Sequence, residues 1–176
     1  MARALLVVPR TRFSCNLYRR ARDLLERQGI QVQVASSIRG EIRAPECTVM
    51  ADARLEEVRG ADYDLVVFVA GRGNRDLLDS AEAHRVAREA LEAGKVVGAT
   101  GLAVAILANA GLLRGRKAAG PISVAVLLRE KGADYTADPV AADDGLVTLR
   151  RSEAFPAFGQ ELLARLPQAE VARKAA

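Results

Sequence analysis

The sequence predicts an α/β fold in which helices cover both faces of a mostly parallel central sheet. Apolar runs of strand length alternate with amphipathic segments of helix length along the chain, as in folds built from strand–helix–strand units. The strongest apolar run, over residues 65–69, has no polar position, which is typical of a strand covered on both faces. Half of the 176 residues are hydrophobic, so the chain can bury a sizeable core.

The first part of the chain predicts a buried strand over residues 4–8, a helix over 14–28 and a second strand over 30–35. A small β excursion over 40–53 and a helical turn over 54–58 follow. Pro9 ends the first strand. Ser14 is placed to cap the helix, and Gly29 to end it.

The second part predicts a strand over residues 65–69, an amphipathic helix over 76–93 and a short strand over 96–99. An almost wholly apolar helix over 102–110 and a further helix over 121–131 follow. The last predicted elements are a hairpin over 135–149 and a closing helix over 155–166. The hairpin would join 135–140 to 145–149. We expect a single domain over residues 1–168 and a frayed tail over 169–176.

Composition and charge narrow the function classes. Lys and Arg number 26 against 22 Asp and Glu, and they are spread among acidic residues, so we expect no nucleic-acid partner. No apolar run is long enough to span a membrane, and the first residues do not resemble a signal peptide. Cys15, Cys47 and His84 have no metal-binding spacing, so no metal or cofactor is expected. The sequence predicts a cytoplasmic protein with reduced thiols.

The sharpest functional signal is the transition from the strand at 96–99 to the apolar helix that begins at Leu102. In parallel sheets ligands bind beyond the carboxyl ends of the strands, here the loops over residues 9–14, 70–75 and 100–102. A bend with almost no loop is the geometry of a nucleophile elbow. Its tip is Gly101, which tolerates a positive φ but has no reactive side chain. The pattern indicates that the geometry is kept and the chemistry is lost.

The stretch EAGKVVGATGLAVAILANAGLLRGRK, residues 92–117, resembles the elbow region of the DJ-1/ThiJ/PfpI family, within the class I glutamine amidotransferase-like superfamily. The resemblance continues in the family's order and spacing over about residues 3–166, through segments 51–58, 62–72, 132–140 and 144–150. It implies a flavodoxin-like three-layer α/β/α sandwich. It also implies a homo-dimer or a higher homo-oligomer.

The departures from the family pattern concern its reactive residues. By this resemblance, Gly101 stands at the elbow cysteine, Leu102 at the histidine after it, and Ser14 at the glutamate that supports the cysteine. All three side chains of the thiol chemistry are therefore absent. The resemblance places the former active-site pocket at Ser14, Ala70, Gly71, Thr100, Gly101 and Leu102.

The sequence therefore predicts a non-hydrolytic protein that binds a small ligand or acts as a structural or regulatory oligomer. The loops that flank the elbow contain four arginines, Arg10, Arg12, Arg72 and Arg75. Together with free N–H groups at the start of the helix after the elbow, they could bind an anion. Arginines in loops can equally well point into solvent.

The alternative is an enzyme, because the family includes peptidases, glyoxalase or deglycase-like enzymes and isocyanide hydratases. A cysteine-dependent hydrolase of the intracellular protease or amidase type, or a glyoxalase/deglycase-like enzyme, would need another nucleophile. Cys15 is the candidate, since a helix N-terminus near Arg10 and Arg12 would lower its pKa. A small buried residue is the other interpretation of Cys15. We expect His84 on a solvated helix surface and assign no role to Cys47.

Overall fold

The computed structural model describes residues 1–167, and seven strands form its central sheet in the spatial order β10-β11-β7-β6-β1-β2-β5. All neighbouring pairs are parallel except β10 and β11. The strands are β1 (Arg3–Val7), β2 (Gln31–Ser36), β5 (Ala53–Arg54), β6 (Leu65–Phe68), β7 (Val96–Thr100), β10 (Val140–Asp143) and β11 (Leu146–Leu149). Two small sheets flank it: β3 (Gly40–Ala44) with β4 (Cys47–Ala51), and β8 (Lys117–Ala119) with β9 (Asp134–Thr136).

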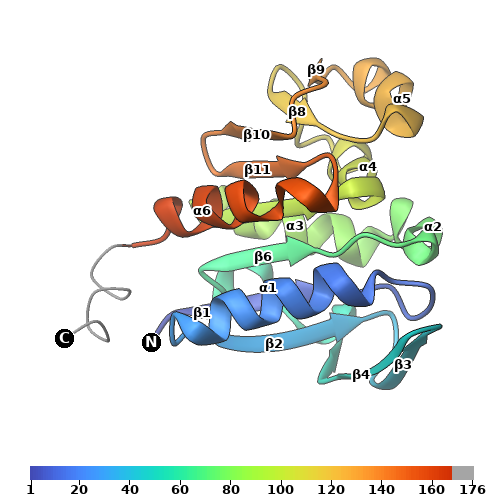
Figure 1. Ribbon diagram of the computed structural model, residues 1–176, viewed down its shortest axis with the longest axis vertical. Helices are drawn as coiled ribbons and strands as arrows, with labels where there is room; N and C mark the ends of the chain where they lie inside the picture. The colour runs from blue at the N-terminus through green and yellow to red at the C-terminus, as the bar shows by residue number, and fades with distance from the viewer. Residues whose placement is uncertain (168–176) are drawn as a thin grey trace.

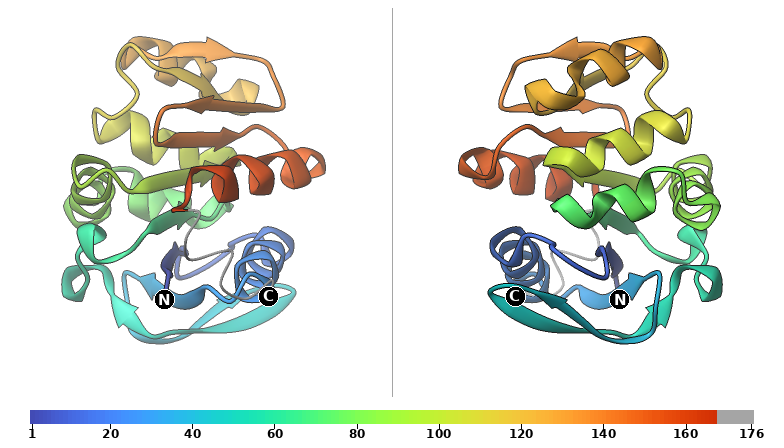
Figure 2. Two further views of the ribbon diagram at one scale, coloured as in Figure 1. Left: turned by 90° about the vertical axis from the view of Figure 1, so that its left-hand side faces the viewer. Right: turned by 90° about the vertical axis from the view of Figure 1, so that its right-hand side faces the viewer.

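Helices cover both faces of this sheet, which confirms the predicted three-layer α/β/α sandwich. They are α1 (Cys15–Arg27), α2 (Arg75–Leu78), α3 (Ala81–Glu92), α4 (Val104–Asn109), α5 (Ala125–Glu130) and α6 (Phe155–Arg165). Helices α1 and α6 lie in front of the sheet in Figure 1, and α3 and α4 lie behind it. Figure 2 shows the three layers from the side. Short 3-10 turns are η1 (Leu55–Glu57), η2 (Gly60–Asp62), η3 (Arg72–Asn74), η4 (Gly101–Ala103), η5 (Ile122–Val124) and η6 (Ser152–Ala154).

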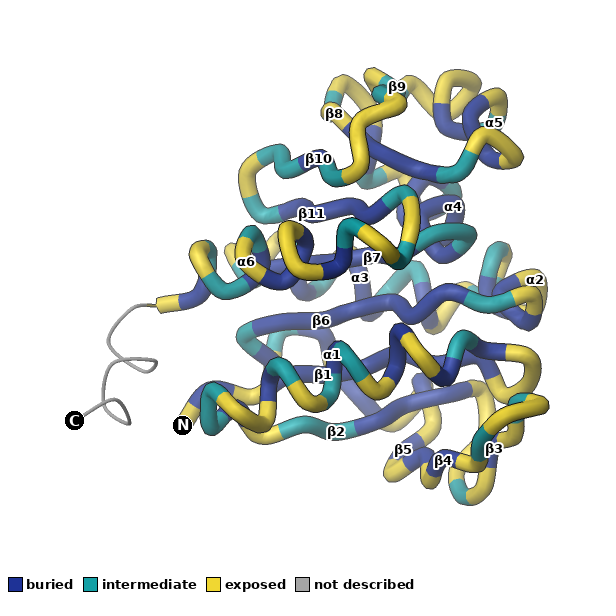
Figure 3. Tube along the Cα trace, in the orientation of Figure 1, coloured by how far each residue is buried: buried dark blue, intermediate teal, exposed yellow. Residues whose placement is uncertain are grey.

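The central strands are buried because their side chains alternate between two apolar layers. Leu5 and Val66 belong to the core between the sheet and α3 and α4, whereas Leu6 and Val67 belong to the core under α1 and α6. This period of two is the ordinary geometry of a strand. Figure 3 shows β1, β6 and β11 largely in dark blue. Burial on both faces explains why the sequence of these strands is a continuous apolar run.

The reversal of strand order places the candidate site. The chain proceeds from β1 to β2 on one side, and β6 then joins β1 on the other side, so strand order reverses between β1 and β6. Ligands of such sheets bind beyond the carboxyl ends of the strands at this point. The loops that follow β1, β6 and β7 meet there, on the right-hand side of Figure 1.

Helix α1 is capped as the sequence predicts. The backbone N–H of Leu17 donates to Oγ of Ser14 over 3.2 Å, and Gly29 follows the helix with a φ of 72°. The helix turns its apolar side to the sheet, where Leu17, Tyr18, Ala21 and Leu25 are buried. The cap and the apolar stripe are local signals, so they could be recognised without the tertiary structure.

The predicted helix over 76–93 is two helices, α2 and α3, separated at Asp79 and Ser80. Ser80 caps α3, because its Oγ accepts a hydrogen bond from the backbone N–H of Ala83 over 3.1 Å. A serine that can satisfy a free N–H group favours a new helix start over continuation of the first helix. The amphipathic pattern of the whole stretch obscured this local signal.

The region after α4 differs most from the prediction. The hairpin is formed by β10 and β11, and Tyr135 instead lies in β9, which pairs in parallel with the unpredicted strand β8. The predicted helix over 121–131 begins as a 3-10 turn before α5. A strand of three residues, such as β8, is too short to show a hydrophobic period, so its sequence carried no signal.

Two further predictions concern the end of the domain and the lack of a membrane-spanning segment. The predicted frayed tail over 169–176, and residue 168 of the predicted domain, lie outside the described residues. Within residues 1–167, no helix is long and apolar enough to cross a membrane.

Candidate functional site

The bend between β7 and η4 has the geometry that the sequence predicted. Gly101 has a φ of 52°, and the chain passes directly from the strand into η4 and then into the buried helix α4. An ideal Cβ on Gly101 would lie 3.1 Å from Cβ of Ala70, which is a tight contact. The left-handed φ favours glycine. The bend is therefore an elbow whose tip carries no reactive atom.

Thr100 supplies the hydroxyl group nearest in sequence to the bend, and this hydroxyl is engaged. Its Oγ1 accepts a hydrogen bond from the backbone N–H of Ala70 over 2.8 Å and donates to the carbonyl oxygen of Phe68 over 3.3 Å. The residue is 2% exposed. Thr100 therefore fixes the loop after β6 against the elbow, and its hydroxyl does not face a ligand.

The loops after β1 and β6 are held together by the backbone. The N–H of Ser14 donates to the carbonyl oxygen of Ala70 over 2.8 Å, and Phe13 forms a bridge with Gly71. A Cβ on Gly73 would lie 1.9 Å from the carbonyl oxygen of Thr11, so only glycine permits this approach. The loops are packed against each other rather than extended into solvent.

Asn74 is a site residue that sequence reasoning missed. It is 2% exposed, accepts a hydrogen bond from the N–H of Gly71 over 2.7 Å and donates to the carbonyl oxygen of Val69 over 3.2 Å. Its side chain thereby closes the turn after β6. The signal was present, because asparagine in a glycine-containing turn often bonds the nearby backbone.

Two cavities meet at these loops, and Arg12, Gly71 and Arg72 line both of them. The elbow cavity, of about 610 Å³, is lined by Arg12, Gly71, Arg72, Asn74, Arg75, Leu78, Leu102, Ala105, Ser123, Val124 and Leu127. The outer cavity, of about 950 Å³, is lined by Arg12, Phe13, Ser14, Cys15, Asn16, Arg19, Arg20, Pro45, Glu46, Gly71 and Arg72. Of the predicted pocket residues, Ala70, Thr100 and Gly101 line neither cavity and instead support their walls.

The structure brings three of the four predicted arginines together. Arg12, Arg72 and Arg75 line the elbow cavity, whereas Nε of Arg10 forms an ion pair with Oδ2 of Asp76 over 3.6 Å. Within residues 1–167, the side chains of Arg12, Arg72 and Arg75 have no ion pair or hydrogen bond. No carboxylate of the described chain lines this cavity. The elbow cavity is therefore a concave site with an unbalanced positive charge.

The α4 segment contributes to this site through side chains rather than through a long helix start. It has six helical residues and follows a 3-10 turn, and the N–H of Val104 already donates to the carbonyl oxygens of Gly101 and Leu102. The predicted helix over 102–110 would have offered more free N–H groups. The positive charge of the elbow cavity therefore comes from the arginines.

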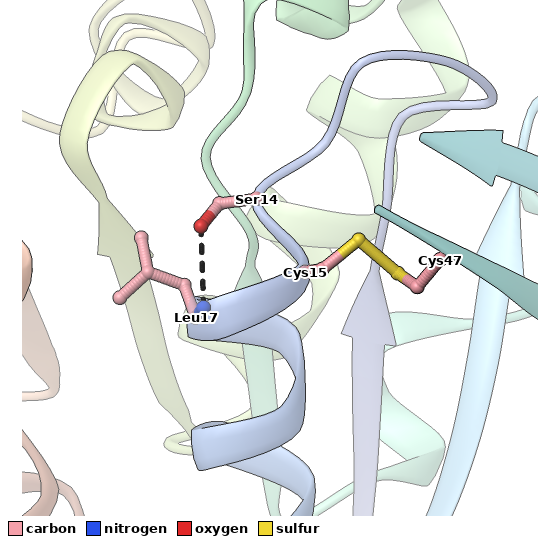
Figure 4. The surroundings of a disulfide bond; sticks show 4 residues. All are labelled: Ser14, Cys15, Leu17 and Cys47. Carbon is pink, nitrogen blue, oxygen red and sulfur yellow. Dashed lines mark hydrogen bonds between the residues drawn. A yellow bond between two sulfur atoms is a disulfide. The ribbon is translucent and has the colours of Figure 1, made fainter. Parts of the chain in front are cut away.

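The expectation of reduced thiols was wrong, because Cys15 and Cys47 form a disulfide and neither cysteine is free. Figure 4 shows this bond joining the first residue of α1 to the start of β4. The β3–β4 hairpin lies beside the loop that precedes α1. There Arg43 forms a β-bridge with Thr11, and the backbone N–H of Arg43 donates to the carbonyl oxygen of Arg10 over 3.3 Å. This contact between distant segments could not be deduced from spacing.

The disulfide changes the interpretation of both cysteines. Cys15, at 4% exposure, is not a thiolate nucleophile while it is oxidised, and Cys47 has a structural role after all. Disulfides persist in oxidising compartments and are rare in the cytosol of mesophiles. The bond therefore contradicts the expected reduced state of the thiols, and the compartment of this chain stays a prediction.

His84 is half-buried rather than fully solvated as expected. Its Nε2 lies 2.7 Å from the carbonyl oxygen of Leu78, and because a carbonyl only accepts, Nε2 is the donor. Nδ2 of Asn109 donates to the same oxygen over 3.1 Å. Both residues thus hold the end of α2 behind the elbow cavity.

The comparisons with known proteins agree with this geometry. The model of the DJ-1/PfpI family matches residues 3–165. General stress protein 18 of Bacillus subtilis is 30% identical over 138 residues, which cover 78% of this chain and 79% of that protein. A deglycase of Thermococcus kodakarensis is 27% identical over 140 residues, which cover 79% of this chain and 84% of that protein.

The fold is shared with solved structures of the same kind. The crystal structure of a ThiJ/PfpI domain protein from Brachyspira murdochii superposes with a TM-score of 0.88 at 23% identity, and the match covers 93% of this chain and 95% of that chain. The elbow after β7 and the family match over nearly the whole described chain lead to one assignment. This chain belongs to the DJ-1/PfpI family.

Proposed function

We propose that this chain is a non-hydrolytic member of its family that binds a small anionic ligand in the elbow cavity. The observation that carries this proposal is the contrast between the bend and its surroundings. Gly101 offers no nucleophile, whereas Arg12, Arg72 and Arg75 line the neighbouring cavity without a carboxylate. Arginine is suited to carboxylate and phosphate groups because its guanidinium forms charge-assisted, often bidentate, hydrogen bonds.

Covalent catalysis finds no support among the groups around the bend. A covalent step needs a nucleophile activated by a base or by a lowered pKa. Gly101 has no side chain, the Thr100 hydroxyl is engaged with Ala70 and Phe68, and Cys15 is bonded to Cys47. Reversible binding is the function that these groups support best.

Ligand binding can be measured by thermal shift and by calorimetry with phosphate, acetate and their uncharged analogues at fixed ionic strength. Anions should raise Tm, because a ligand that binds only the folded state stabilises it by mass action. Arg72→Gln and Arg75→Gln should each weaken binding about tenfold, the loss expected for one charge-assisted hydrogen-bonded contact.

Arg27→Gln is the matched control, because Arg27 is exposed in the last turn of α1, away from the start of that helix at the outer cavity. It removes the same charge and should leave binding unchanged. Equal losses in Arg27→Gln and Arg75→Gln would show that only net charge matters. That result, or the absence of any anion effect, would contradict the proposal.

A second candidate is a deglycase-like enzyme, and the naming of several relatives as deglycases supports it. These relatives are 27–30% identical to this chain. Such an enzyme would need Cys15 in its reduced form. We expect no turnover of methylglyoxal or of glycated amines with or without a dithiol reductant. Turnover that appears only on reduction, persists in Cys47→Ser and disappears in Cys15→Ser would establish the enzyme instead.

We also propose that the chain forms a homo-dimer or a higher homo-oligomer. Its membership of a family whose members commonly self-associate supports this proposal, and exposed apolar side chains at Ile38 and Met50 are compatible with it. Sedimentation equilibrium should give a multiple of 18.8 kDa. A mass that stays at one chain up to high micromolar concentration would contradict self-association.

A further inference from the structure

We propose that the elbow cavity takes an amphipathic anion, meaning a carboxylate or phosphate group attached to a compact hydrocarbon body. This inference rests on the proposed function and narrows it to a class of ligand. The cavity has one cationic side and one apolar side, and their residues come from separate elements of the fold. A ligand that satisfies both sides must combine charge and hydrocarbon.

The apolar side consists of three leucines that the fold leaves partly uncovered. Leu78 ends α2, Leu102 lies in η4, and Leu127 lies in α5. Each packs against the core between the sheet and α3 and α4, and each is only half-buried. All three line the elbow cavity together with Ala105 and Val124. Covering such apolar surface is favourable in proportion to the area removed from water. A ligand that covers these leucines would therefore gain free energy of binding from apolar surface that the folded protein leaves exposed.

The cationic side of the cavity contains no acidic residue among the described residues that line it. Asp76 directly follows Arg75 in the chain, but it does not line the elbow cavity and it pairs with Arg10. Arg12, Arg72 and Arg75 therefore remain without an acidic partner among the described residues. Arg10 is thus paired outside the cavity and is not one of its cationic residues.

The two sides together define the ligand. Inorganic phosphate would pair with the arginines and leave the leucines in water, whereas a neutral hydrocarbon would leave the arginines unpaired. The volume of about 610 Å³ lies within the range of about 300–1,000 Å³ typical of small-molecule sites. Leu102, which stands where the family resemblance places a histidine, makes the wall next to the bend apolar rather than ionisable.

A homologous series of straight-chain carboxylates tests this inference. Acetate, butyrate, hexanoate and octanoate, with hexanamide as the uncharged analogue, are titrated calorimetrically at constant ionic strength. We expect Kd to fall by about two- to fourfold for each added methylene, the gain typical of a buried CH₂ group. Hexanamide should bind at least about tenfold more weakly than hexanoate, because it lacks the charge for the arginines.

Variants separate the two sides of the cavity. Leu102→Asn and Leu127→Asn should each flatten the dependence on chain length while acetate binding is kept, and Arg75→Gln should weaken every carboxylate by the same factor. Leu112→Asn is the matched control, because Leu112 is also half-buried against the same core but lines neither cavity. Two leucine positions keep the test valid if one variant folds poorly, which circular dichroism would reveal.

The outcomes distinguish this inference from the proposed function. Carboxylate binding that is independent of chain length would overturn the amphipathic ligand and leave the anion site intact. Hexanamide binding as tightly as hexanoate would overturn both, since the charge would then contribute nothing. Absence of binding by every carboxylate would also overturn both.

Discussion

Gly101 has a φ of 52°, and a Cβ placed on it would contact Cβ of Ala70 at 3.1 Å. Both features work against any side chain at this position. A non-glycine residue in a sparsely populated backbone region costs on the order of 1–3 kcal/mol and persists only where the surroundings enforce it. This chain avoids that cost at the bend and gives up a reactive side chain in return.

We therefore expect Gly101→Cys to lower the free energy of unfolding by about 1–3 kcal/mol. Urea denaturation followed by circular dichroism measures the change. Gly94→Ala is the control for backbone strain alone, because Gly94 has a φ of 72° and nothing within 4 Å of an added Cβ. Gly101→Cys should cost more than Gly94→Ala; a variant as stable as the parent would mean that residue 101 is not left-handed.

At the scale of elements, the disulfide joins two segments whose only described strand pairing is the single bridge between Thr11 and Arg43. It ties the start of α1 to the β3–β4 hairpin across a sequence separation of 32 residues. The hairpin lies outside the central sheet, and its tip residues Pro45 and Glu46 form one wall of the outer cavity. The shape of that cavity thus depends on a covalent bond as well as on packing.

Removal of this bond should destabilise the protein measurably. We expect Cys15→Ala combined with Cys47→Ala to lower the free energy of unfolding by about 3–4 kcal/mol, from the closure entropy of a loop of this length. The parent with dithiothreitol is the parallel sample. Alkylation of the unfolded, unreduced protein should find no free thiol, and full labelling of both cysteines would show that the bond does not form in solution.

The break between α2 and α3 shows how an element boundary was missed. The apolar spacing over 76–93 continues across Asp79 and Ser80, so periodicity alone predicts one helix. The structure ends α2 there, where Ser80 caps α3 and where His84 and Asn109 bind the carbonyl oxygen of Leu78. A local cap at Ser80 and one contact from α4, made by Asn109, therefore accompany the boundary that periodicity missed.

At the scale of the whole molecule, one sheet connects the two apolar cores. Strands β1 and β6 contribute alternate side chains to each core, so neither layer can be removed without exposing the other face of the same strands. This arrangement predicts a single cooperative unfolding transition, as is usual for single domains of this size.

Tyrosine fluorescence and far-UV circular dichroism should therefore give coincident urea transitions. The chain has three tyrosines and no tryptophan, and Tyr135 reports on the peripheral strand β9, where its hydroxyl donates to the carbonyl oxygen of Gly120 over 3.0 Å. A variant with Tyr18→Phe and Tyr63→Phe isolates that signal. If the fluorescence of Tyr135 changed at a lower urea concentration than the circular dichroism signal, the β8–β9 edge would unfold as a separate unit.

Much of the architecture could be predicted from the residues because its signals are local. Continuous apolar runs indicate strands that are covered on both faces, and Ser14 with Gly29 delimits α1. Gly101 before an apolar segment was sufficient to predict a bend without a nucleophile. These features depend on the character of neighbouring residues, which a linear sequence displays directly.

The tertiary structure alone decided which distant groups meet. It paired Cys15 with Cys47, paired Arg10 with Asp76, and left Arg12, Arg72 and Arg75 to face three leucines in one cavity. These outcomes depend on how far the hairpin folds back and on where loops from different strands converge. No local period or propensity encodes such distances, because they follow from the packing of the whole chain.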